Sequence, residues 1–250
     1  MNYSPLRYPG GKSRAINILK GYIPNKTKEI CSPFFGGGSF EIYLSKQKID
    51  IYGYDNFYPL VCFWKSLKNN KYELINIIKQ YYPLDKKIFY ELQKSIILSK
   101  NEIDIGAIFY ILNRCSFSGT GLSGGMSINH PRFTVSSIER LNKFDMNFQI
   151  NHLSFDISIL LHDCLIFADP PYLIKQKLYG NKGDMHNNFN HNLLAKILNE
   201  HRNFILTYNN CEEIKDLYHD HKFIYPEWKY GMSNKKESNE ILIISKDIKF

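Results

Sequence analysis

The chain contains the stretch Cys164-Leu165-Ile166-Phe167-Ala168-Asp169-Pro170-Pro171-Tyr172, in which a short apolar run leads directly into an acid, two prolines and an aromatic residue. Such a run predicts a buried strand, and the prolines end it because each lacks an N–H group and fixes φ. Ligands of open α/β sheets bind beyond the carboxyl ends of strands. We therefore expect a rigid turn that presents one carboxylate and one flat ring to a polar ligand. A proline-rich turn without function is the alternative at this point.

A glycine-rich turn follows an earlier predicted strand. Glu29-Ile30-Cys31-Ser32-Pro33 reads as a strand, and Phe34-Phe35-Gly36-Gly37-Gly38-Ser39 leads from it into a helix. Glycine permits positive φ and lets a ligand approach the backbone closely. The next predicted strand, Ile49–Asp55, ends in an acid 17 residues after Gly38, near the spacing at which a carboxylate reaches ribose hydroxyls. Together these segments favour a nucleotide-type site.

The N-terminal segment carries a second glycine turn, Tyr8-Pro9-Gly10-Gly11-Lys12-Ser13. Gly-Lys-Ser is typical of a phosphate-binding P-loop, but Leu6 stands where that loop needs its first glycine. The segment therefore predicts a tight turn that brings an aromatic face and an ammonium group to an anionic ligand. An ordinary loop before a helix remains the alternative.

Helical periodicity dominates residues 57–148, a block too long for a single crossover connection. It predicts an inserted, mainly helical subdomain. Near its end lies a Gly- and Ser-rich loop, residues 113–125, followed by Arg132 and Arg140, which suits contact with a nucleic-acid groove. A surface loop without function is the alternative.

Elsewhere strands alternate with helices, which predicts an α/β fold with a mostly parallel sheet covered on both faces. The last two strands, Phe223–Tyr225 and Glu240–Ile244, are close enough in sequence to pair antiparallel, and polar residues 173–190 predict a loop over the site.

Charge and cysteine content indicate which kind of partner the protein binds and in which compartment we expect it. The formal net charge is +8, with the excess in the first three-fifths of the chain, which favours a polyanionic partner over a merely basic surface. The five cysteines include no C-x-x-C pair, which excludes the familiar zinc spacings. Their odd number and the lack of a leader-like N-terminus indicate a cytoplasmic protein, and no apolar run approaches the ~20 residues of a membrane helix.

Four stretches, in this order, resemble the Dam-type (D12 class, alpha group) DNA adenine-N6 methyltransferases. They are Arg7–Lys12, Pro33–Ser39, the helical insert and the tetrapeptide Asp169–Tyr172, and the closing strand from Asn239 to Ile243 is also similar. The resemblance implies a Rossmann-like, S-adenosylmethionine-dependent catalytic domain of residues 1–56 and 149–250, with a DNA target-recognition domain of residues 57–148. Two departures stand out. Ser32 lies where the family often has an acid, and the loop of the insert is more Gly- and Ser-rich than the family's loop, which often carries an aromatic–arginine pair.

The resemblance also implies roles for individual residues. Tyr8 and Lys12 would bound the methionine end of the donor, with Phe35, Gly36 and Gly38 close to it. Asp55 would hold the ribose, and Phe155 with Asp156 the adenine moiety. Asp169, Pro170, Pro171 and Tyr172 would be catalytic and hold the target base, with Asp169 also beside the donor. Residues expected to contact DNA are Asn113, Arg114, Ser118 and Arg132.

The implied reaction is methylation of the exocyclic N6 of a flipped adenine in double-stranded DNA, with no metal required. A monomer and a dimer both stay open, as does a cognate restriction endonuclease as partner. The rival enzyme is a cytosine-N4 DNA methyltransferase, whose target is also an exocyclic amine. Asp169 favours adenine because the cytosine enzymes more often have Ser before Pro-Pro. The rival of another class is a non-catalytic DNA-binding protein that keeps the fold.

Overall fold

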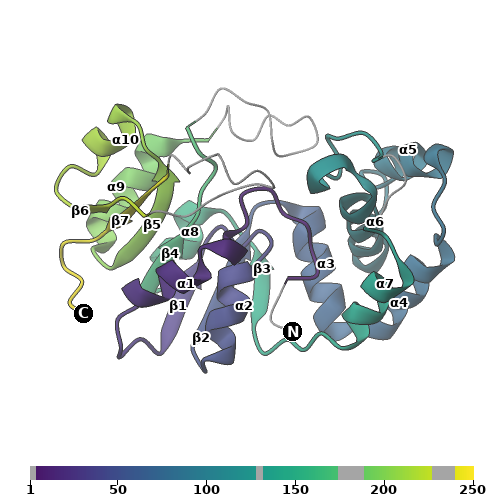
Figure 1. Ribbon diagram of the computed structural model, residues 1–250, viewed down its shortest axis with the longest axis horizontal. Coiled ribbons are helices and arrows are strands. Elements are labelled where there is room, and N and C mark those ends of the chain that lie inside the picture. The colour runs from purple at the N-terminus through teal and green to yellow at the C-terminus, as the bar shows by residue number, and fades with distance from the viewer. Residues whose placement is uncertain (1–3, 128–131, 174–188, 227–239) are drawn as a thin grey trace.

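A seven-stranded sheet forms the centre of the protein in the computed structural model, which describes residues 4–127, 132–173, 189–226 and 240–250 (Figure 1). The strand order is β3-β2-β1-β4-β5-β7-β6, and all pairs are parallel except those that β7 makes with β5 and β6. This confirms the expected mostly parallel, Rossmann-like sheet with its antiparallel C-terminal strand. The strands are β1 (Glu29–Ser32), β2 (Asp50–Asp55), β3 (Gln149–His152), β4 (Leu165–Ala168), β5 (Phe204–Asn209), β6 (Lys222–Ile224) and β7 (Glu240–Ile244).

Helices cover both faces of the sheet. Successive strand side chains point to opposite faces, so Leu165 and Phe167 of β4 join one hydrophobic cluster while Ile166 and Ala168 join the other. The first face is covered by α1 (Ile16–Leu19) and α2 (Ser39–Lys46), and the second by α8 (Phe155–Leu160), α9 (His191–His201) and α10 (Glu212–Leu217). Because both faces are buried, β4 needs an unbroken apolar sequence. Short 3-10 helices are η1 (Lys12–Arg14), η2 (Lys20–Tyr22) and η3 (Phe117–Gly119).

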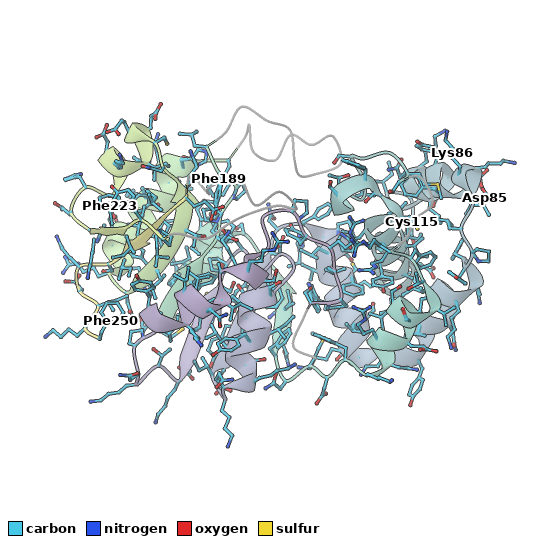
Figure 2. All side chains as sticks on the ribbon, viewed as in Figure 1. Asp85, Lys86, Cys115, Phe189, Phe223 and Phe250 are labelled. Atoms are coloured by element: carbon cyan, nitrogen blue, oxygen red, sulfur yellow. The ribbon has the colours of Figure 1, made fainter. Side chains whose placement is uncertain are left out.

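Between β2 and β3 the chain forms the predicted helical insert, which lies beside the β3 edge of the sheet (Figure 1). Its helices are α3 (Tyr58–Asn69), α4 (Lys71–Gln80), α5 (Lys86–Ser95), α6 (Glu102–Cys115) and α7 (Val135–Asn142). Helix α3 packs on both α6 and β3, and one hydrophobic cluster runs from the sheet into the insert. Figure 2 shows Asp85, Lys86 and Cys115 in this helical half, and Phe189 and Phe223 in the sheet half.

Polar residues begin the helices of the insert. The side chains of Asp85 and Asn101 accept backbone N–H groups at the starts of α5 and α6, and Thr134 forms a capping box with Ser137 at the start of α7. Each cap satisfies a donor that the first helical turn leaves unpaired. These caps explain the short polar breaks in the helical sequence pattern. In the described part of the chain, no helix is both long enough and apolar enough to cross a membrane.

Candidate active site

A pocket of about 590 Å³ opens at the carboxyl ends of β1, β2 and β4. Its volume is in the range of small-molecule sites. The structure brings together in its wall every residue that the sequence suggested for the donor and the target base. These are Tyr8, Lys12, Phe35, Gly36, Gly38, Asp55, Phe155, Asp156, Asp169, Pro170, Pro171 and Tyr172.

The carboxylate of Asp169 is held from three directions. Lys12 Nζ lies 2.6 Å from its Oδ1 and 2.8 Å from its Oδ2, although the two residues are 157 positions apart in sequence. Thr207 Oγ1 donates to Oδ1 at 2.6 Å, and the Tyr172 hydroxyl donates to the same oxygen at 3.3 Å. Lys12 is only 4% exposed, so its ammonium group compensates the charge of Asp169 with little competition from water.

The backbone explains how these groups meet. Pro170 ends β4, which leaves Asp169 at the strand tip beside β5, where Ala168 pairs with Leu206. Thr207 therefore stands next to Asp169. The ring of Tyr172 stacks on that of Tyr208, with centroids 5.8 Å apart, and this contact fixes one side of the ring. Sequence reasoning missed Thr207, which only the register of the two strands could have indicated.

The turn after β1 is built around Tyr8 and Asp55. Gly36 has φ of +51°, and a Cβ on it would lie 2.8 Å from the ring of Tyr8, so both the conformation and the contact require glycine. Asp55 Oδ2 accepts the Gly36 N–H at 2.8 Å, and Oδ1 accepts the Phe57 N–H at the same distance. Burial raises the pKa of Asp55 to about 6, against the opposing effect of these backbone hydrogen bonds. Asp55 thus holds the glycine turn in shape at the wall of the pocket.

Three aromatic rings gather around the start of α8. Phe34, Phe155 and Phe189 have centroids between 5.2 and 5.6 Å apart. Asp156 lies next to Phe155 and also lines the pocket. Phe35 lines the pocket and is also a core residue, 2% exposed, that packs on Trp64 and Phe148. The adjacent Phe34 lines the pocket as well and is only half-buried, and the sequence carries no signal of which of the two would be more exposed.

Of the four residues expected to contact DNA, two have structural partners. Asn113 is 1% exposed, and its amide bonds to both the N–H and the carbonyl of Arg7. Its side chain therefore ties the N-terminal segment to the end of α6. Arg114 donates to the carbonyl of Arg132. Ser118 and Arg132 are exposed.

Positive charge is concentrated at this end of the insert. Burial lowers the pKa of Arg114, and the charges of Arg7, Arg140 and Arg132 lower it further. In the described part of the chain, none of these four arginines forms an ion pair with an acid. Such a cluster is suited to a polyanion.

The loop that the sequence predicts over the site falls largely on residues 174–188, which lie outside the described residues. Within the described ranges, no three His, Cys, Asp or Glu side chains are grouped so that they could hold a metal ion.

Comparison with known proteins gives one family and two relatives. The model of the family described as D12 class N6 adenine-specific DNA methyltransferase matches residues 8–232. Type II methyltransferase M.CviBI of Paramecium bursaria Chlorella virus NC1A is 24% identical over 178 residues, which cover 67% of this chain and 68% of the viral protein. Type II methyltransferase M1.LlaDCHI of Lactococcus lactis subsp. cremoris is 22% identical over 185 residues, which cover 67% of this chain and 64% of that protein. Since the family match includes the N-terminal turn, the glycine turn, the insert and the tetrapeptide, the chain belongs to the D12 class of N6 adenine-specific DNA methyltransferases.

Proposed function

We propose that this protein transfers the methyl group of S-adenosylmethionine to the exocyclic N6 of an adenine that is flipped out of double-stranded DNA. The observation that carries the proposal is the fixed carboxylate of Asp169 at the end of β4, beside the ring of Tyr172. This carboxylate lies in the same pocket as the glycine turn Gly36–Gly38. A non-catalytic DNA-binding protein would have no need of this arrangement.

The pocket residues fit the parts of the donor. The carboxylate of Asp55 accepts backbone N–H groups of Gly36, Phe57 and Asn56, and its remaining acceptor capacity is available to a ribose hydroxyl. The rings of Phe34, Phe155 and Phe189 offer apolar faces for the adenine moiety, with the carboxylate of Asp156 available to its amino group. Gly36 lets the ring of Tyr8 lie directly against the backbone at the wall of the pocket, where it can contact the donor. The donor supplies an electrophilic methyl group on a sulfonium.

Asp169 and Pro170 would activate the target amine. The lone pair of an adenine amino group is delocalised into the ring, and two acceptors aimed at its hydrogens draw it out of conjugation. Asp169 Oδ1 already accepts three donors, whereas Oδ2 accepts only Lys12 among the described residues, so Oδ2 has the capacity to accept the amine. The carbonyl of Pro170 is the second acceptor, and the prolines hold it rigidly, which is electrostatic preorganisation. Alignment of the amine with the methyl group can contribute ~7–11 kcal/mol to lowering the barrier.

Tyr172 would hold the flipped base. One side of its ring is packed against Tyr208 and its hydroxyl is fixed by Lys12 at 3.0 Å and by Asp169. A ring that is oriented in this way can stack on a base, and such stacking is worth ~1–3 kcal/mol per base.

The insert, residues 57–148, would recognise the DNA target, with residues 1–56 and 149–250 as the catalytic domain. The cluster of Arg7, Arg114, Arg132 and Arg140 supports this role because phosphate groups would compensate its charge. Asn113 would act indirectly, since it joins the end of α6 to Arg7, which directly precedes the pocket residue Tyr8. The names of both relatives support a role in a restriction-modification system with a cognate endonuclease.

The test compares wild-type protein with Asp169→Ala in a methyl-transfer assay that uses labelled donor and double-stranded DNA. We expect Asp169→Ala to lose methyl transfer while its affinity for DNA, measured by gel shift, stays close to that of the wild type. Undiminished transfer by Asp169→Ala would overturn the proposal. Asp163→Ala is a matched control, because Asp163 lies before β4, outside the pocket.

A further inference from the structure

A second buried acid faces the pocket, and the sequence did not single it out. Glu41 lies in the first turn of α2 and is 4% exposed, yet it lines the pocket. Its Oε1 accepts a hydrogen bond from Ser32 Oγ at 2.8 Å, and Ser32, at the end of β1, is itself buried. The strand end and the helix start thus hold one carboxyl group at the wall of the pocket.

The charge of Glu41 is not compensated by an ion pair among the described residues. Lys12, the cation whose charge reaches it, is engaged by both oxygens of Asp169. Burial raises the pKa of Glu41 to about 7, and the charge of Asp169 raises it further, while hydrogen bonds from Ser32 and from its own backbone lower it. Burial of an acid is costly unless a partner compensates its charge. The hydrogen bonds from Ser32 and from Glu41's own backbone use only part of the acceptor capacity of the carboxylate, which can also accept a cationic ligand group.

The other acids of the pocket have different positions or partners. Both oxygens of Asp55 hold backbone N–H groups, Asp169 is paired with Lys12, and Asp156 lies beside the aromatic rings. Glu240 lies at the start of β7, where it pairs with Asn209 of β5. Glu41 is bonded to Ser32 at the end of β1, and β1 pairs with β4, whose end carries Asp169. Glu41 therefore lies at the end of the pocket where methyl transfer is proposed, within reach of the charges of Asp169 and Lys12. In S-adenosylmethionine the ammonium group is four bonds from the sulfonium that carries the methyl group, and must therefore bind near that end.

We propose that Glu41, oriented by Ser32, binds the ammonium group of the donor's methionine part. This inference rests on the proposed use of S-adenosylmethionine. It adds a ligand-binding role for a residue of α2, and it accounts for an acid buried in a helix whose neighbours Phe40 and Ile42 are core residues.

Calorimetry with two ligands tests the inference. S-adenosylhomocysteine keeps the amino-acid end of the donor and is not turned over, whereas 5′-methylthioadenosine lacks that end. A hydrogen bond to a charged group that is lost from a buried site weakens binding about 10- to 100-fold. We expect Glu41→Gln to weaken the binding of S-adenosylhomocysteine by this factor and to leave the affinity for 5′-methylthioadenosine unchanged. Glu73→Gln, an exposed acid on α4, is the matched control and should change neither affinity.

The outcomes separate the inference from the proposed function. Equal affinity of wild type and Glu41→Gln for S-adenosylhomocysteine would overturn the role of Glu41 and leave the donor assignment intact. An equal loss of affinity for both ligands in Glu41→Gln would also overturn the role of Glu41, because Glu41 would then only maintain the shape of the pocket. Failure of the wild type to bind either ligand would remove the proposed donor and, with it, this inference.

Discussion

Thr207 gives a direct test of how Asp169 is held. Its side chain is fully buried in β5, and its hydroxyl donates to Asp169 Oδ1 at 2.6 Å. Thr207→Val keeps the branched shape and removes only the donor. A hydrogen bond to a charged group contributes ~1.5–3 kcal/mol, and each ~1.4 kcal/mol of barrier is a factor of ten in rate. If Asp169 must be oriented to accept the amine, the rate of methyl transfer should fall about 10- to 150-fold.

The assay is single-turnover methyl transfer to DNA at saturating donor, since it separates the chemical step from product release. Thr207→Ser is the matched control because serine keeps the hydroxyl, and it should retain most of the rate. Calorimetry with S-adenosylhomocysteine should give the same affinity for all three proteins, because Thr207 does not line the pocket.

A wild-type rate in Thr207→Val would refute the claim that orientation of Asp169 through Oδ1 matters for the reaction. Equal losses in Thr207→Val and Thr207→Ser would refute it as well, since the serine variant keeps the hydrogen bond. A loss of donor affinity in the valine variant would show that Thr207 acts on the pocket as a whole.

Three further predictions concern other parts of the site. Tyr172→Ala should slow methyl transfer about 5- to 150-fold through lost base stacking, and Tyr172→Phe should lose less because it keeps the ring; full activity of Tyr172→Ala would count against the flipped base. Arg132→Ala should reduce the magnitude of the slope of log affinity for DNA against log salt concentration by about one. Lys222→Ala, on the edge strand β6 at the other end of the sheet, is the control and should leave the slope unchanged. An unchanged slope in Arg132→Ala would contradict contact of Arg132 with phosphate. Glu41 and Asp55 should each make the free energy of unfolding fall as pH rises from about 4 to about 7, because their raised pKa values make the folded state bind protons more tightly than the unfolded chain does. Glu41→Gln should lack the part of this decline that comes from Glu41, up to about 3 kcal/mol in the free energy of unfolding measured by chemical denaturation. Identical pH profiles of the wild type and Glu41→Gln would disprove this prediction.

Sequence patterns predicted the elements around Asp169 because their signals are local. The apolar run that ends at Pro170 gave β4, and the glycines from Gly36 to Gly38 gave the turn between β1 and α2. The antiparallel pairing of β6 with β7 followed from the short distance in sequence between two strand patterns. In each case the backbone chemistry of a few neighbouring residues determines the structure.

Contacts between distant segments could not be predicted in the same way. The ion pair of Lys12 with Asp169 depends on how the N-terminal turn packs on the sheet, and the position of Thr207 depends on strand register. A polar pattern around Asn113 suggested a DNA-facing loop, but polarity does not say which side chain turns inward to bind the backbone. Glu41 gave no signal at all, since a single acid in a helix is usually exposed.

The central claim is that Asp169 accepts the exocyclic amine of adenine during methyl transfer, and the identity of the modified base tests it most directly. DNA methylated by the purified protein would be digested to nucleosides and analysed by mass spectrometry, with Asp169→Ala treated in parallel. We predict N6-methyladenine from the wild type and no methylated nucleoside from Asp169→Ala. N4-methylcytosine from the wild type, or equal amounts of N6-methyladenine from both proteins, would contradict the account.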